Sequence, residues 1–256
     1  MKKAALTGLP LVFCAALICP ISLAGESQLA REARRMLAEN PDDTRTMNKA
    51  AKSLYKEGLH DEAVAVWRAM MKLRPAMAEP HFRVGLAYFD RVQNEQAVAE
   101  FRKAVELDPA YAEAHYHLGT AYHELDDAEG AIREYRAAID HDPALPEAND
   151  SLGRVLLDKG RATEAVQAFR AELRLQPKAA PVYFNLGCAL KETGDYDEAI
   201  RAFEDSIRYT SARDGQEEIE QALSMILETR SKKTRSLSPD LDEEPESGPT
   251  LGLSKL

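Results

Sequence analysis

Cysteine and tryptophan are scarce in this sequence. Its 256 residues include three cysteines and one tryptophan. Two of the cysteines, Cys14 and Cys19, lie in an apolar N-terminal segment, so removal of that segment would leave Cys188 without a partner for an internal disulfide. Neither a disulfide framework nor a closed zinc site with cysteine ligands is therefore expected. Stability must come from the packing of apolar side chains.

Basic residues are also fewer than acidic ones. The chain carries 33 basic and 43 acidic residues, which gives a formal net charge of −10. A chain of this charge is repelled by the phosphate backbone of nucleic acids unless a local basic patch overcomes the repulsion. Only a short basic stretch is visible, at Lys232, Lys233 and Arg235. We therefore expect no nucleic-acid partner.

Motifs that carry enzyme chemistry are absent as well. The sequence contains no P-loop, glycine-rich dinucleotide turn, nucleophile elbow or Cys-x-x-Cys pair. Three histidines are close together, His115, His117 and His123, but metal ligands on one helix normally stand three or four residues apart, and no cysteine or carboxylate set completes a site. We assign no catalytic, cofactor-binding or metal-binding residue, and expect a protein that is not an enzyme.

Long hydrophobic runs are missing except at the N-terminus. Residues 1–24 begin with Lys2 and Lys3, continue with a mostly apolar stretch, and end with the small residues Ser22 and Ala24 before Gly25. This pattern is typical of a secretory signal peptide, with an uncleaved membrane anchor as the alternative. We expect an exported protein, in a bacterial periplasm or secreted, with no membrane span after cleavage.

What the sequence does contain is a repeat of 34 residues, best seen in Ala78 to Tyr111. The same types of residue recur at fixed positions in consecutive units. Positions 8, 11, 20, 24, 27 and 32 hold Gly85, Tyr88, Ala97, Phe101, Ala104 and Pro109 in this unit, Gly119, Tyr122, Ala131, Tyr135, Ala138 and Pro143 in the next, and Gly153, Leu156, Ala165, Phe169, Glu172 and Pro177 in the one after.

Each unit predicts two helices. Apolar residues recur at spacings of three and four, which is the pattern of an amphipathic helix. Positions 8, 20 and 27 are small where two helices cross closely, and the aromatic residues fill the gaps between neighbouring units. Gly58, Gly160 and Gly194 can adopt the left-handed conformation that ends a first helix. Proline at position 32 closes the unit because it cannot continue a helix.

A 34-residue period in these residue types resembles the tetratricopeptide repeat (TPR) family. The resemblance implies an all-α fold, a right-handed superhelical solenoid of stacked helix-turn-helix units. The predicted boundaries are a signal peptide at 1–24, an N-terminal capping helix at 25–43, repeats 1 to 5 at 44–77, 78–111, 112–145, 146–179 and 180–213, a C-terminal capping helix at 214–230 and a disordered tail at 231–256.

Two features depart from or complete the repeat pattern. Glu172 occupies position 27, where a carboxylate does not suit a tight helix crossing, so we expect its side chain to reach solvent. In the C-terminal capping helix, Ile219, Leu223 and Ile226 form a stripe that we expect to face the stack.

In the resembling family, positions 2, 5, 9, 12 and 13 of the first helices line a concave groove that binds partners. Carried over to this chain, the resemblance implies a groove for a protein or an extended peptide. Its candidate contact residues are Asn48, Lys52, Tyr55, Lys56, Phe82, Leu86, Phe89, Tyr116, Thr120, His123, Asp150, Arg154, Phe184 and Lys191.

The charge pattern of this groove suggests how a peptide would lie. An acidic group would sit near Lys52 and Lys56, an apolar side chain against Phe82 and Phe89, and a basic stretch beyond them. The carboxylate clamp of cytosolic co-chaperones in the family is absent, because its third-unit positions hold Glu113 and His117 in place of basic residues. The expected function is a scaffold in a cell-envelope process, and the alternative is a structural subunit that self-associates, as a homo-oligomer, through the ends of its stack.

Overall fold

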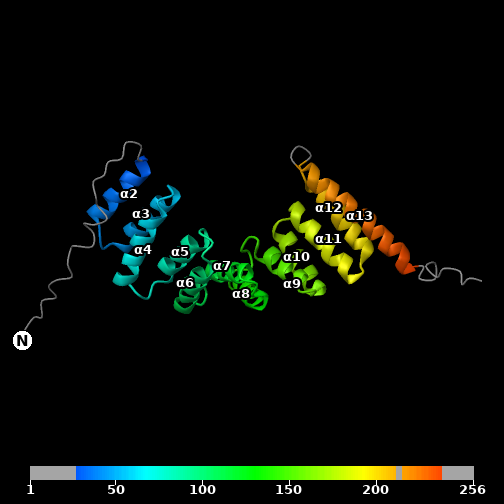
Figure 1. Ribbon diagram of the computed structural model, residues 1–256, viewed down its shortest axis with the longest axis horizontal. Coiled ribbons are helices and arrows are strands. Elements are labelled where there is room, and N and C mark those ends of the chain that lie inside the picture. Colours follow the sequence, from blue (N-terminus) through cyan, green and yellow to red (C-terminus); the bar gives the residue numbers. More distant parts are fainter. Residues whose placement is uncertain (1–26, 212–214, 238–256) are drawn as a thin grey trace, which may run out of the picture. The chain divides into compact units, whose positions relative to one another are not determined.

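The computed structural model describes residues 27–211 and 215–237, and in these residues all regular structure is helical, with twelve α-helices and no strands (Figure 1). The predicted all-α fold is confirmed. The described residues form two compact parts, an N-terminal half (27–143) and a C-terminal half (144–211 and 215–237). The handedness of a superhelix through the whole chain stays a prediction.

The N-terminal half contains seven helices, and each packs mainly on the helices next to it in the chain. Short turns connect them, so that consecutive helices form helix-turn-helix pairs. The helices are α2 (Gln28–Glu39), α3 (Thr44–Lys56), α4 (His60–Leu73), α5 (Ala78–Phe89), α6 (Asn94–Leu107), α7 (Ala112–Glu124) and α8 (Ala128–His141). Helices α3, α5 and α7 are the first helices of repeats 1 to 3.

The C-terminal half continues the same alternation with five helices. They are α9 (Ala148–Asp158), α10 (Ala162–Leu175), α11 (Ala180–Thr193), α12 (Tyr196–Tyr209) and α13 (Gln216–Leu237). Helix α9 begins only at Ala148 because Glu147, the residue before it, has a left-handed backbone with φ of 66°. None of the helices in the described ranges is long and apolar enough to cross a membrane.

A left-handed residue follows the first helix in every repeat, at position 15. Gly58, Gly160 and Gly194 have φ of 77°, 72° and 86°, which confirms the prediction from these glycines. In repeats 2 and 3 the same position holds Val92 and Asp126, with φ of 58° and 59°. Because a β-branched side chain is unfavourable in this conformation, Val92 marks a strained turn that the sequence pattern did not reveal.

The small residue at position 8 packs directly against the aromatic ring at position 24 of its own repeat. A Cβ atom added to Gly85, Gly119, Gly153 or Gly187 would lie 2.6 to 2.8 Å from the nearest ring carbon of Phe101, Tyr135, Phe169 or Phe203. The rings therefore fill space within a repeat, and they also contact the next one, since Phe101 stacks on His117 with ring centroids 5.9 Å apart.

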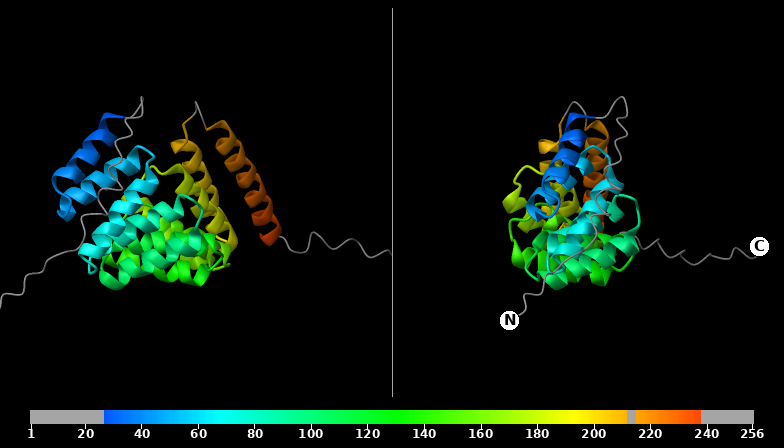
Figure 2. Two further views of the ribbon diagram at one scale, coloured as in Figure 1. Left: turned by 60° about the vertical axis from the view of Figure 1, so that its left-hand side comes forward. Right: turned by 90° about the vertical axis from the view of Figure 1, so that its left-hand side faces the viewer.

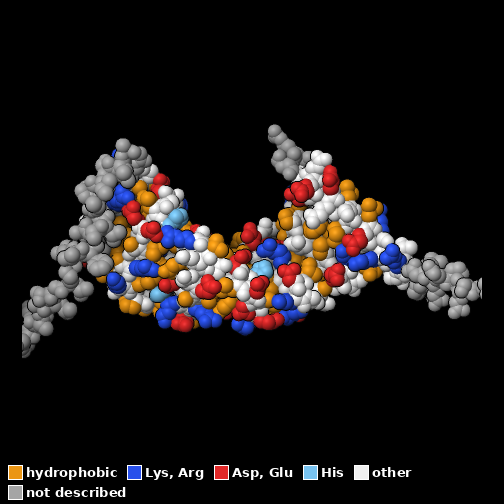
Figure 3. Space-filling model, in the orientation of Figure 1, with side chains coloured by type: hydrophobic (Ala, Val, Ile, Leu, Met, Phe, Trp, Pro, Cys, Tyr) orange, Lys and Arg blue, Asp and Glu red, His pale blue; other side chains and the backbone are white. Residues whose placement is uncertain are grey.

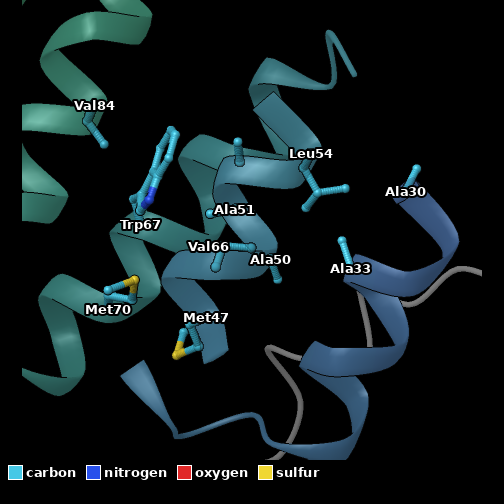
Figure 4. Close-up of a cluster of buried hydrophobic side chains, with 11 residues drawn as sticks. Ala30, Ala33, Met47, Ala50, Ala51, Leu54, Val66, Trp67, Met70 and Val84 are labelled. Atoms are coloured by element: carbon cyan, nitrogen blue, oxygen red, sulfur yellow. The ribbon is translucent and has the colours of Figure 1, made fainter. Parts of the chain in front are cut away.

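Trp67 occupies the aromatic position of the first repeat and is almost fully buried. Figure 4 shows its ring between Val84 of α5 and Ala51 of α3. The indole N–H donates to Asn48 Oδ1 at 3.1 Å, so the polar edge of the ring is satisfied within the core. The ring thus joins the first repeat to the second.

Helix α13 differs from the predicted C-terminal cap in two respects. It continues to Leu237, so the prediction of a disordered tail is wrong for residues 231–237, where Lys233 pairs with Asp197 of α12. Its buried face is formed by Ala222, Ile226 and Thr229. Of the predicted stripe, Ile226 is buried and Ile219 is partly buried, whereas Leu223 is 49% exposed, so the prediction is wrong for Leu223. Figure 2 shows α13 lying alongside α12.

The signal peptide, residues 212–214 and the tail from residue 238 lie outside the described residues.

Candidate functional site

The N-terminal part of the predicted groove is crossed by polar contacts between successive first helices. Lys52 Nζ on α3 lies 2.7 Å from Glu79 Oε1 on α5, and Arg83 Nε donates to the same oxygen at 3.0 Å. Asn48 Nδ2 donates to it at 3.3 Å. The positive charge of Lys52 is therefore already paired with a carboxylate of the next repeat.

These contacts change the ionisation of Glu79. Its partial burial favours the neutral acid, but hydrogen bonds from Lys52, Arg83 and Asn48 outweigh burial and lower its pKa to about 2. Glu79 is a carboxylate at neutral pH. Together with these partners it links the first and second repeats.

Two further predicted groove residues also make contacts within the protein, Tyr55 through a hydrogen bond and Phe82 through ring packing. The hydroxyl of Tyr55 donates to Asp90 at the end of α5. Phe82 is 4% exposed, and its ring packs against Phe101, Tyr111 and His117 with centroids 5.9, 5.0 and 5.5 Å away. Phe82 therefore belongs to the core, and replacing it would test folding before it tested partner contact.

The remaining predicted residues of this half are open to solvent to different degrees. Leu86, Phe89, Tyr116, Thr120 and His123 are partly exposed. The list is completed by Lys56, which is exposed. Thr120 Oγ1 accepts from the hydroxyl of Tyr135 at 3.2 Å and donates to the backbone oxygen of Tyr116 at 3.1 Å. On the face shown in Figure 3, acidic and basic side chains are interspersed.

In the C-terminal half, polar contacts again join first helices. Asn185 Nδ2 on α11 donates to Asp150 Oδ1 on α9 at 3.1 Å, and Arg154 Nε lies 3.4 Å from Asp150 Oδ2. Lys191 Nζ lies 3.2 Å from Glu228 Oε1 on α13, with 10% of the lysine side chain exposed. Helix α13 therefore stands where the first helix of a further repeat would stand.

The C-terminal half also contains a cleft of about 740 Å³. It lies where the N-terminal ends of α9, α11 and α13 meet the C-terminal ends of α10 and α12. Of the predicted groove residues, the cleft brings together Asp150 and Phe184, whereas Arg154 and Lys191 lie outside its lining. Phe184 is partly exposed, and its ring meets that of Phe203 edge to face at 5.5 Å.

Glu172 lines this cleft, which corrects the prediction that its side chain reaches solvent. The residue is fully buried, at 0% exposed. Its Oε1 accepts hydrogen bonds from Gln176 Nε2 at 2.7 Å and from the backbone N–H of Glu147 at 3.3 Å. These donors reach it because α10 ends beside the left-handed turn at Glu147, and they hold the carboxylate inside the fold.

Several residues of the cleft were not among the predicted contacts. Gln176 and Tyr209 lie at the ends of second helices, and Glu218 and Gln221 lie on α13. The predicted contacts were all on the first helices of the repeats, whereas these residues lie at the ends of second helices or on α13. Besides the predicted Asp150 and Phe184, the unusual carboxylate at position 27 was the sequence signal in this region.

Comparison with protein-family models gives three adjoining matches. A model described as TPR repeat matches residues 85–126. Two models described as tetratricopeptide repeat match residues 127–181 and 180–211. No curated protein sequence matches this chain significantly.

Solved structures with the same fold cover most of the chain. A crystal structure of MamA has 25% sequence identity and a TM-score of 0.61, and the match covers 66% of this chain and 92% of MamA. YrrB, described as a TPR protein with an unusual peptide-binding site, has 19% identity and a TM-score of 0.63, covering 79% of this chain and 99% of YrrB. The identity to YrrB is low enough that this likeness shows the fold alone.

Proposed function

We propose that this chain, a tetratricopeptide repeat protein, is a non-enzymatic scaffold that holds an extended segment of a partner protein against its first helices. The observation that carries the proposal is the cleft of about 740 Å³ in the C-terminal half. There Asp150 and Phe184, two residues of the surface predicted to bind partners, lie in one hollow.

The chemistry of the cleft suits a peptide. Its walls combine apolar surface from Pro181, Val182 and Phe184 with polar groups from Asn185 and Tyr209. Pockets that bind ligands are mostly apolar with a few polar groups that fix orientation, and their volumes are on the order of 300–1,000 Å³. The cleft, at about 740 Å³, falls within this range.

The family also supports the proposal of a peptide-binding scaffold. Tetratricopeptide repeat proteins are typically scaffolds without enzymatic activity, and YrrB is described as having a peptide-binding site. Among the described residues, the side chains that line the cleft offer no nucleophile hydrogen-bonded to a general base. We propose binding without a chemical step.

The N-terminal sequence is the basis for a proposal about where in the cell the protein acts. Residues 1–24 have the pattern of a secretory signal peptide, with small residues at Ser22 and Ala24 before Gly25. We propose that the chain is exported and serves a process in a bacterial cell envelope. Fractionation of cells that express the full chain tests this, because an uncleaved protein in the cytosol would contradict export.

Affinity capture from an envelope extract tests the scaffold function. The full chain would be compared with a Phe184→Ala, Tyr209→Ala variant of the cleft and with a matched Leu175→Ala variant, which changes a 42% exposed residue outside it. We expect a partner that is enriched by the wild type and by Leu175→Ala and lost from the cleft variant. Equal capture by all three folded proteins would show that the cleft is not the binding site.

The predicted alternative, self-association, is favoured by one observation. On α13, Leu223 and Leu227 are 49% and 68% exposed and lie four residues apart on one face. In this case the chain would form a dimer without any partner, and Leu223→Glu with Leu227→Glu would return it to a monomer. Sedimentation velocity of the two proteins decides between a monomeric scaffold and a self-associating subunit.

A further inference from the structure

Glu172 stands at a position that is filled by uncharged side chains in the other four repeats. The equivalent residues are Met70, Ala104, Ala138 and Ser206, all of them buried. Glu172 is as fully buried as the two alanines. A carboxylate in such a place is unfavourable unless its oxygens are paired, so its presence here needs an explanation.

A structural role explains one of its two oxygens. Oε1 accepts from Gln176 and from the backbone N–H of Glu147, which helps to hold the left-handed turn before α9. Oε2 is buried and has no hydrogen-bond partner. A buried polar atom without a partner is uncommon in folded proteins and points to a group that the fold itself does not supply.

The charges around Glu172 indicate the sign of that group. The cleft is lined by Glu147, Asp150, Glu172 and Glu218, against a single basic residue, Lys178. Asp150 is bonded to Asn185 and approached by Arg154. The cleft as a whole is anionic and would attract a cation.

The apolar walls indicate the kind of cation. Phe184 and Tyr209 present aromatic surface within the same cleft. Lysine and arginine carry a long apolar stem below the charged group, and that stem packs well on aromatic side chains. A guanidinium group also offers several N–H donors in one plane, which suits a carboxylate with a free oxygen.

We propose that the cleft of the C-terminal half selects a lysine or arginine side chain of the bound segment and that Glu172 is its anionic partner. This inference rests on the proposed scaffold function and specifies the chemistry of its ligand. Gln176 is exposed and covers the carboxylate with one side-chain amide. The proposal requires this side chain to move aside so that the cation can reach Glu172.

The test uses two blocked peptides of alternating leucine and threonine that differ only at the central residue, arginine in one and its neutral isostere citrulline in the other. Binding to the full chain is measured by calorimetry, and the site is located by NMR shifts of the backbone amides of Glu147, Gln176 and Asn185. We expect the arginine peptide to bind at least tenfold more tightly than the citrulline peptide.

Three variants separate this role from a structural one. Glu172→Gln keeps the shape of the side chain and should remove the preference for arginine, whereas Glu192→Gln, at an exposed residue outside the cleft, removes the same charge and should leave the preference intact. Glu172→Ala introduces the residue found in repeats 2 and 3, and should keep or raise the melting temperature while it abolishes the preference.

Other outcomes overturn the proposal in recognisable ways. Equal affinity for the two peptides, no binding of either, or Ca²⁺ binding that needs Glu172 would each show that the free oxygen does not serve a peptide cation. A lower melting temperature for both Glu172 variants with unchanged binding would assign Glu172 to the fold alone. If Glu172→Gln still captures the partner that the Phe184→Ala, Tyr209→Ala variant loses, the scaffold function stands and the cation site falls.

Discussion

Gly153 and Phe169 lie in such close contact that no side chain fits between them. A Cβ atom on Gly153 would be 2.6 Å from Cε1 of the ring and 2.8 Å from Cδ1 and Cζ, and Phe169 is fully buried. The same pair of positions is in contact in repeats 2, 3 and 5. The repeat therefore depends on a glycine that lets an aromatic ring come close to the helix backbone.

Gly153→Ala should destabilise the protein. The ring has to move, at a cost of about 1–3 kcal/mol for an overpacked core, which exceeds the roughly 1 kcal/mol that alanine gains over glycine in a helix. Urea denaturation followed by circular dichroism measures the change. In a Gly153→Ala, Phe169→Leu variant the methyl group has room, so its loss of stability should be smaller than the sum of the two single losses.

Val92→Gly should stabilise the protein. Val92 has φ of 58° and is 80% exposed, so glycine relieves the left-handed strain and removes little packing. We expect a gain of about 0.5–1 kcal/mol, because the strain of about 1–2 kcal/mol exceeds the entropy that glycine loses. Asp126→Gly, at the equivalent position of repeat 3, should gain less, since aspartate tolerates this conformation better. An unchanged urea midpoint for Val92→Gly would show that the turn is not strained.

Stability should fall in acid partly through Glu79. Its pKa is lowered to about 2 by Lys52, Arg83 and Asn48 against the opposing effect of burial, whereas an unfolded glutamate has a pKa near 4.5. A lowered folded-state pKa stabilises the fold above about pH 4.5, and this contribution is lost as the pH falls towards 2.

Glu79→Gln should therefore lower the free energy of unfolding at pH 7 by about 1–2 kcal/mol and reduce its decline between pH 4.5 and 2.5. Glu113→Gln, at an exposed residue on α7, serves as the control. Parallel pH profiles for the wild type and Glu79→Gln would mean that the contacts of Glu79 do not stabilise the fold.

Cys188 should react slowly with alkylating reagents in the native protein. It is partly buried on α11, and burial raises the pKa of its thiol, although Lys191 acts in the opposite direction. Less thiolate is then present at pH 7 to act as the nucleophile. Iodoacetamide labelling followed by mass spectrometry should be at least tenfold slower in native protein than in urea, and the native rate should rise with pH up to the raised pKa. Equal rates would contradict the buried placement.

The helical repeat could be predicted from the sequence because its determinants are local. Gly119 and Tyr135 are sixteen residues apart and recur with the period of the repeat, so one sequence displays the relation several times. The left-handed turn at Gly160 is signalled by the residue itself. Such patterns identify helices and turns without knowledge of the tertiary contacts.

The features that were not predicted depend on single contacts between distant residues. The burial of Glu172 requires the backbone N–H of Glu147, which lies in a left-handed turn that the repeat pattern does not contain. Lys52 appeared free to bind an acidic group, but Glu79, from the next repeat, pairs with it. Likewise α13 continues to Leu237, and within this extension Lys233 pairs with Asp197 of α12. None of these contacts recurs at equivalent positions of the other repeats in the described residues, so no period reveals them.

Packing between sequence neighbours within each half has a consequence for how the protein folds. Residues in contact are close along the chain, so little loop entropy is lost before contacts form, and such topologies fold on the microsecond to millisecond scale. Neighbouring repeats are then coupled only through their shared interfaces, and an end can open while the rest stays folded. A segment that lies across α9, α11 and α13 would contact three of these elements at once. Its binding would make them unfold together, and hydrogen exchange in all three would slow to a common rate.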